Sequence, residues 1–124
     1  MIFLDTHVVV WLYAGLVTKL SKDAIELIEA NNLQISQMVR LELQYLYEIK
    51  RITVPPDMIL TGLARSIGLK ISDGLHSSAF DQALEYAWTR DVFDRLIVAE
   101  ASASEAVLIS KDRKIRDQYT RAVW

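Results

Sequence analysis

The chain has 124 residues, enough for one ordinary domain, and no cysteine, which excludes disulfides, zinc–thiolate sites and cysteine nucleophiles. Its net charge of −2 argues against a module that coats nucleic acid by positive charge alone, and its 52% hydrophobic residues indicate a well-filled core. No apolar run approaches the roughly 20 residues that span a bilayer, and the N-terminus lacks the pattern of a signal peptide, so we expect a cytoplasmic protein with no membrane segment.

Short apolar runs that end at a polar residue predict the strands. They are rich in aliphatic and β-branched side chains, and residues that favour turns or helix starts follow them, such as Asp5, Ser36 and Ser110. We expect strands over 2–4, 33–35, 69–71 and 107–109, with a fifth at a sheet edge over 122–124.

Longer amphipathic patterns between these runs predict helices. Ser21 and Ser36 occupy N-cap positions, and Pro55 and Pro56 indicate a connection between two helices. The expected helices cover 8–15, a segment that begins after Ser21, 37–51, 57–67, 75–86, 92–102 and 113–119. Strands that alternate with helices form parallel βαβ units, so we predict a single domain over 1–124 with a four- to five-stranded parallel sheet between two helical layers.

Two acids follow strands directly. Asp5 comes after the first strand and Asp112 shortly after the fourth, and each precedes a helix. In open α/β sheets the carboxyl ends of the strands form the edge where ligands bind. Aspartate is also a preferred N-cap, so a purely structural role remains open for both residues.

Glu42 lies within an apolar stripe of the third predicted helix. Met38, Tyr45 and Ile49 fall on the same side of the helix at helical spacing, which predicts that the carboxylate points inward. A buried carboxylate needs a cation or a strong hydrogen-bond donor. The partner is either a metal ion or a basic side chain, for which the candidates are Arg40 and Arg95.

Asp91 and Asp94 begin the sixth predicted helix. Asp91 fits an N-cap and Asp94 the third helical position, an acidic form of the capping box. Asp94 also shares a side of the helix with Ile97, Val98 and Ala101, residues that we expect to face the sheet. Its carboxylate is therefore predicted to point toward the edge of the core.

The acids follow strand ends or occupy inward-facing helix positions, so their carboxylates can lie close together. Several neighbouring carboxylates cannot all ionise without a cation, and a site made only of oxygen ligands favours Mg²⁺ or Mn²⁺ over Zn²⁺. Such sites commonly hydrolyse phosphodiesters, because the metal activates a water and stabilises the displacement at phosphorus.

The order and setting of the acids resemble the PIN domain, and within it the VapC toxins of prokaryotic toxin–antitoxin pairs. The resemblance covers nearly the whole chain. It rests on four blocks and on the ending Val123-Trp124: IFLDT (2–6), SQMVRLEL (36–43), RDVFDRLIVAEA (90–101) and LISKD (108–112). The third block is the most specific, although Val92 stands where the family commonly has proline.

The resemblance implies a PIN-like three-layer α/β/α fold and a Mg²⁺- or Mn²⁺-dependent endoribonuclease that acts as the toxin of such a pair. The implied catalytic and metal-binding residues are Asp5, Glu42, Asp94 and Asp112, with Asp91 as a less regular member of the set. Thr6 and Ser110 match small hydroxyl residues that orient the carboxylates.

The resemblance further implies an RNA substrate, a homodimer and a cognate antitoxin protein as partners. The apolar segment from Val9 to Leu16 fits this, since a helix that is apolar nearly all round is buried on more than one side. The main alternative is a catalytically inactive binding or regulatory module on the same fold. A receiver-type phosphoacceptor domain fits less well, because only one acid follows the first strand and the third strand ends at Ser72-Asp73.

Overall fold

The computed structural model describes all residues from 1 to 124 and has a five-stranded, fully parallel sheet. The sheet order is β3-β2-β1-β4-β5, so the first strand of the sequence is the central one. The strands are β1 (Ile2–Leu4), β2 (Leu33–Ile35), β3 (Lys70–Ile71), β4 (Val107–Ile109) and β5 (Ala122–Val123). The predicted four- to five-stranded parallel sheet is confirmed, and the fifth strand is present at an edge.

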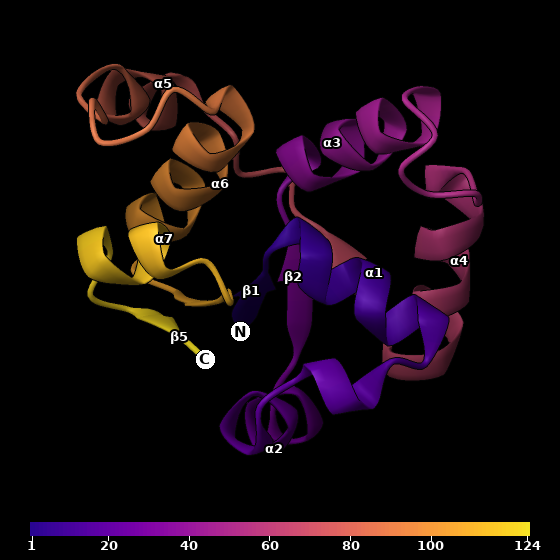
Figure 1. Ribbon diagram of the computed structural model, residues 1–124. Coiled ribbons are helices and arrows are strands. Elements are labelled where there is room, and N and C mark those ends of the chain that lie inside the picture. Colours follow the sequence, from indigo (N-terminus) through magenta and orange to yellow (C-terminus); the bar gives the residue numbers. More distant parts are fainter.

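Helices cover both faces of this sheet, which makes the fold three-layered, as expected. They are α1 (Thr6–Ala14), α2 (Lys22–Ala30), α3 (Gln37–Glu48), α4 (Pro56–Ile67), α5 (Ser77–Leu84), α6 (Val92–Ala103) and α7 (Arg113–Gln118), with a 3₁₀ turn, η1 (Val17–Lys19), after α1. Figure 1 shows α5, α6 and α7 on one side of the sheet and α1 and α4 on the other. Helix α3 packs against both α1 and α6, so it joins the two layers at one end of the sheet.

The central strand β1 and its neighbour β4 are apolar at every position, because both faces of the sheet are covered there. Phe3, Leu4, Ile35, Leu108 and Ile109 are each at most 1% exposed and lie in one continuous core. None of the helices is both long and apolar enough to cross a membrane.

Most element boundaries follow the predicted capping residues. Side chains of Asp5, Ser21, Ser36, Asp91 and Asp112 each accept a hydrogen bond from a backbone N–H at the start of the helix that they cap. Helix α1 begins directly after Asp5, as an N-cap at that residue predicts. Two helices differ from the prediction: α3 ends at Glu48 instead of near residue 51, and α5 is shorter at both ends. The ends of α3 and α5 carried no such capping signal in the sequence.

Strand register places the residues that follow the central strands at one edge. Ile2 is aligned with Leu33 of β2 and with Val107 of β4. Since all strands are parallel, the positions just after them also come level, and these are occupied by Asp5, Ser36 and Ser110. This carboxyl edge, which α3 spans, is where the site is formed.

Candidate active site

One pocket at the carboxyl edge of the sheet collects the acids singled out in the sequence. It has a volume of about 310 Å³. Its lining residues come from α1, α3, α6 and the segments around them: Asp5, His7, Val8, Trp11, Glu42, Asp91, Asp94, Lys111 and Asp112. All four main candidate acids and Asp91 therefore border the same space, together with a single lysine.

Asp5 is the most buried of these carboxylates. Its backbone N–H donates to the carbonyl of Ile109 over 3.0 Å, which extends the pairing of β1 with β4 by one residue. Its Oδ1 accepts from the N–H of Thr6 at 2.8 Å, and its Oδ2 accepts from the hydroxyl of Ser110 at 2.6 Å. Burial raises the pKa of Asp5, and the Ser110 hydrogen bond opposes that rise. Asp5 is thus both an N-cap and a fixed carboxylate in the pocket.

Glu42 faces Asp5 from helix α3 and is 9% exposed. The hydroxyl of Thr6 donates to its Oε1 at 2.5 Å. Burial raises the pKa of Glu42 to about 7; the Thr6 hydrogen bond lowers it, and the charges of Asp5 and Asp91 raise it further. The two hydroxyl residues picked from the sequence, Thr6 and Ser110, therefore each hold one pocket carboxylate.

The reasoning that predicted the burial of Glu42 was wrong in one respect. Tyr45 and Ile49, two residues of its supposed apolar stripe, are 48% and 45% exposed. Glu42 is buried on the side of α3 that also carries Val39 and Leu43. The salt-bridge alternative is not realised, because the only ion pair in the protein joins Arg40 to Asp57 at 3.9 Å.

The other basic candidate, Arg95, is also engaged elsewhere. Its Nε donates to the carbonyl of Thr89 at 2.9 Å, and its guanidinium lies 3.4 Å from the carbonyl of Ala83. Glu42 and the acids around it are therefore not neutralised by any arginine of this chain.

The carboxyl group of Asp94 has a strongly raised pKa. Burial raises its pKa to about 8, and the charges of Asp5, Asp91, Glu42 and Asp112 all raise it further. No hydrogen bond or positive charge acts in the opposite direction. A carboxylate in this position is stabilised only by a proton or by a cation that comes from outside the chain.

Asp91 and Asp112 cap helices with one oxygen each. Oδ1 of Asp91 accepts from the N–H of Asp94 at 3.1 Å, and Oδ1 of Asp112 accepts from the N–H of Ile115 at 3.2 Å. The N-cap role left open in the sequence is therefore real for both. It does not remove them from the pocket, since both side chains line it.

The chemistry of the donor set fits a hard divalent cation. The pocket offers carboxylate oxygens, no sulfur, and one imidazole, that of the exposed His7. In this structure no three of these side chains are placed closely enough to hold one metal ion together. A bound cation would therefore have to draw these carboxylates inward.

Two further pocket residues were not assigned to the site from the sequence. Trp11 belongs to the apolar segment from Val9 to Leu16 that was expected to be buried, yet it is only half-buried and lines the pocket. Its ring lies 6.0 Å from that of His7, one helical turn earlier. His7 and Trp11 are four residues apart, so they share one side of α1, and α1 begins at the strand end marked by Asp5. This spacing is a signal that could have placed both residues in the site. Lys111 stands next to Asp112 in the sequence, a position that allows either a phosphate ligand or an ion-pair partner of the acids.

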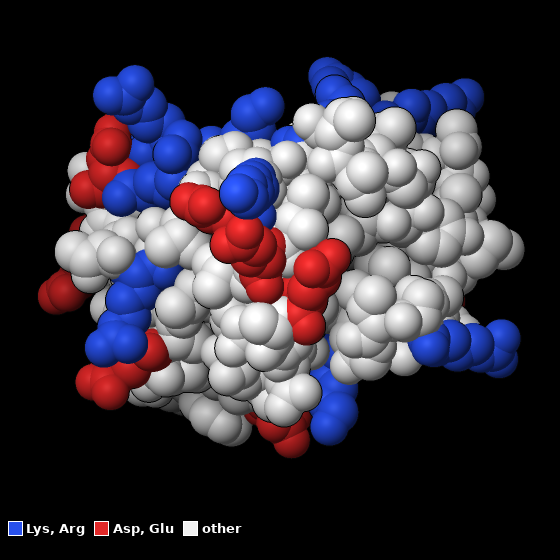
Figure 2. Space-filling view, turned by 90° about the horizontal axis from the view of Figure 1, so that it is seen from below, with Lys and Arg blue, Asp and Glu red and all other residues white.

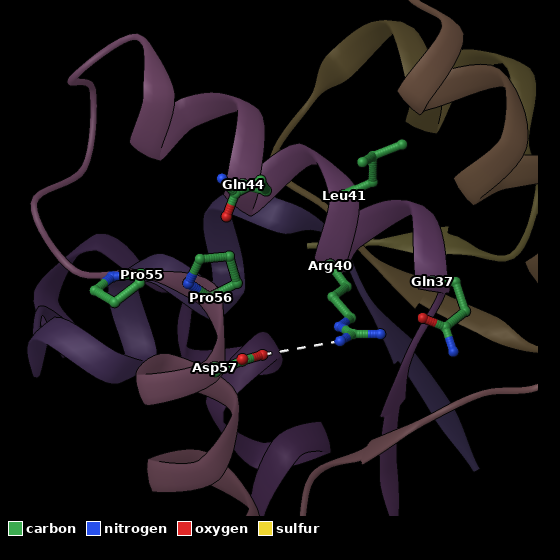
Figure 3. A pocket seen from close by; sticks show the side chains of 7 residues that line it. All are labelled: Gln37, Arg40, Leu41, Gln44, Pro55, Pro56 and Asp57. Carbon is green, nitrogen blue, oxygen red and sulfur yellow. Dashed lines mark ion pairs between the residues drawn. The ribbon is translucent and has the colours of Figure 1, made fainter.

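A second hollow of about 420 Å³ lies between α3 and α4 and is lined mainly by polar and proline side chains. Figure 3 shows Arg40 and Asp57 facing each other across it. Asp57 is its only acid, and that acid is ion-paired. The hollow therefore lacks the clustered, unpaired groups that make the pocket at the sheet edge a candidate catalytic site.

Comparison with known proteins identifies a family and a fold. The family model of the PIN domain matches residues 2–120. A search of curated proteins gave no significant match.

Two solved structures resemble the whole chain. One is VapBC2 from Rickettsia felis bound to a DNA fragment from its promoter, with 21% identity, a TM-score of 0.70, and coverage of 99% of this chain and 96% of that chain. The other is a toxin–antitoxin complex from Klebsiella pneumoniae, with 18% identity, a TM-score of 0.68, and coverage of 100% and 97%. At these identities the likeness establishes a shared fold.

Proposed function

The chain belongs to the PIN domain family, and from this premise we propose that it is a Mg²⁺- or Mn²⁺-dependent endoribonuclease and the toxin of a toxin–antitoxin pair. The observation that carries the proposal is the pocket of carboxylates at the carboxyl edge, with no basic partner for Glu42 or Asp94. Such a site is built to receive a cation. The similarity to two toxin–antitoxin structures supports the biological role.

Asp5, Glu42, Asp94 and Asp112 would hold the metal, with Asp91 beside them. A bound Mg²⁺ or Mn²⁺ lowers the pKa of a coordinated water and stabilises charge on the phosphorus oxygens during hydrolysis of an RNA phosphodiester. The hydroxyls of Thr6 and Ser110 fix the orientation of Glu42 and Asp5. Fixing these two acids reduces the conformational entropy that metal binding would otherwise remove.

The deciding experiment measures cleavage of single-stranded RNA by the purified protein with Mg²⁺, with Mn²⁺ and with EDTA. We expect metal-dependent cleavage that Asp5→Asn reduces by at least about 100-fold, because the change removes charge from the metal site and keeps side-chain volume. Asp81→Asn, at an exposed acid of α5 outside the pocket, is the matched control and should retain activity.

Cleavage that persists in EDTA, or an Asp5→Asn protein with full activity, would refute the nuclease assignment. A protein that cleaves no RNA but binds divalent metal and a partner protein would instead support the inactive PIN-fold module. The family match identifies the domain but does not test whether the chain cleaves RNA, so this alternative is the second candidate.

A homodimer and a cognate antitoxin are part of the same proposal. Apolar side chains are exposed on two regions that no element of the chain covers. Leu41, Tyr45 and Ile49 follow one another at helical spacing on α3, and Leu16 and Val17 lie after α1. Light scattering at micromolar concentration should give a mass above the 14.2 kDa of one chain. A monomer that gains no mass with the product of a neighbouring gene would contradict both partners and leave the nuclease assignment standing.

A further inference from the structure

Lys111 is the only basic residue that lines the acidic pocket, and it makes no ion pair there. Its ammonium lies 5.7 Å from the ring centroid of Trp11, in cation–π contact, although Asp112 is its neighbour in the sequence. The structure thus separates two interpretations that the sequence left open. The charge of Lys111 is not used to neutralise the acids.

A second lysine, eight residues after Trp11, contacts the same indole. The ammonium of Lys19, in η1, lies 5.9 Å from the Trp11 ring centroid. Trp11 is itself held by edge-on contact with Trp124 at 5.9 Å and by His7 at 6.0 Å. One partly buried ring that lines the pocket is therefore contacted by two ammonium groups, and one of these, on Lys111, also lines the pocket.

The acids of the pocket repel a negatively charged nucleic-acid strand, and these two cations can offset that repulsion. A nucleic-acid strand is a polyanion, and five carboxylates line the pocket where its scissile phosphate would react. Contacts to neighbouring phosphates supply the affinity and fix the register of a bound strand. Cations beside the acids are the groups that can make such contacts.

The side of the molecule where α2 lies, at the amino end of the sheet, shows no broad basic surface that could bind a nucleic-acid strand instead (Figure 2). There the acidic side chains gather near the middle of the face, and lysines and arginines are scattered mainly along its margins (Figure 2). Because that face offers no broad basic surface for a nucleic-acid strand, the cations next to the pocket are the candidates for guiding it.

We propose that Lys19 and Lys111, held over Trp11, form a clamp that binds a backbone phosphate next to the scissile one in a single-stranded RNA. The inference rests on the proposed function and adds to it a substrate-positioning site on one side of the carboxylates. Because the clamp contacts phosphate and not bases, its contribution is independent of sequence. Lys19, Lys111 and Trp11 are positioning residues and take no part in the chemical step.

The test measures binding separately from cleavage. Fluorescence anisotropy of labelled 12-nucleotide single-stranded RNAs of two unrelated sequences is recorded in EDTA over a range of salt concentrations. The Lys19→Met/Lys111→Met double variant should raise Kd roughly tenfold for both RNAs and lower the slope of log K against log salt by about 0.7, the contribution of one phosphate contact on a single strand.

The matched control is Lys22→Met/Lys70→Met, which removes the same charge from two exposed lysines outside the clamp. It should change Kd and salt slope much less. In the cleavage assay, the clamp variant should raise KM with little change in kcat. Trp11→Leu should weaken binding while both lysines remain, and Trp11→Phe should restore much of it, because a phenyl ring still offers a cation–π face.

Equal losses in the clamp and control variants would overturn the proposal, since they would show a general effect of net charge. An unchanged salt slope in the clamp variant would overturn it as well. RNA binding that depends on the two lysines in a protein that never cleaves RNA would refute the proposed function and keep the clamp. Metal-dependent cleavage with an unchanged KM in the clamp variant would refute the clamp and support the proposed function.

Discussion

Replacing Asp94 by asparagine should stabilise the metal-free protein at pH 8, although it removes a proposed metal ligand. The pKa of Asp94 is raised from 3.8 to about 8 by burial and by four neighbouring acids. When an acid has a higher pKa in the folded than in the unfolded protein, the protein is most stable below the unfolded pKa. Its stability then falls as the pH rises toward the folded pKa. The wild-type protein in EDTA should therefore become less stable between pH 4 and pH 8.

The size of the effect follows from the same pKa. A rise from 3.8 to about 8 corresponds to about 6 kcal/mol between the two protonation states. Asp94 is only half-buried and titrates together with Glu42, so solvent screening and coupling reduce this figure. We expect Asp94→Asn to raise the free energy of unfolding by about 2 kcal/mol at pH 8, and by close to nothing at pH 4, where both side chains are neutral.

Urea denaturation in EDTA at the two pH values measures the difference. With a slope near 1.5 kcal/mol/M for a domain of this size, the urea midpoint at pH 8 should rise by roughly 1 M. Saturating Mg²⁺ should reverse the order of the two proteins, because it stabilises only the folded wild type. Asp81→Asn serves as the control and should show no pH-dependent gain. The same gain at pH 4 and pH 8, or a loss at pH 8, would refute the electrostatic account of the pocket.

Three further changes test separate features. Thr6→Val removes the hydroxyl that lowers the pKa of Glu42, so the acidic limb of the pH–rate profile should move to higher pH and the rate at pH 7 should fall roughly tenfold. Glu100→Gln should raise stability at pH 7 by about 1 kcal/mol in thermal denaturation, because both carboxylate oxygens of this fully buried residue lack a hydrogen-bond partner; an unchanged or lower Tm would show that Glu100 is stabilised in another way. Leu43→Ala, in the core behind the site, should cost about 2–5 kcal/mol in urea denaturation and leave kcat of the folded fraction unchanged, whereas a collapse of kcat would link this position to the chemistry.

The sequence predicted features that depend on short-range chemistry. A three-residue apolar run followed by Asp5 or Ser110 specifies both a strand and its end, and a side chain that caps a helix acts within three residues of itself. The acids at strand ends could therefore be placed at one edge once the strands were taken as parallel. The order of the strands, with β1 at the centre, depends on pairings across the whole chain and was not predicted.

The side of α3 that faces the core also depends on distant contacts. Helical spacing groups Tyr45 with Glu42, but it equally groups other residues around the helix, and only the packing partners decide which side is buried. Here α1 and α6 cover the side with Val39 and Leu43, and Tyr45 stays half-exposed against Phe93 with 5.7 Å between the ring centroids. Lys111 shows the same limit, since the ring that holds its ammonium lies 100 positions earlier in the sequence.

No positively charged side chain of this protein forms an ion pair with the pocket carboxylates, and this lack would favour binding of a cation from outside. At neutral pH a proton neutralises Asp94 in most metal-free molecules and Glu42 in about half of them, because their pKa values are about 8 and 7. A divalent metal would replace these protons, so metal binding should release them and strengthen as the pH rises. A guanidinium from a partner protein matches two carboxylates through paired hydrogen bonds and would occupy the same oxygens. On the proposed function, an antitoxin that inserts an arginine would therefore compete with the catalytic metal. On the same proposal, arginines of the chain itself paired with these acids would block both the metal and the antitoxin.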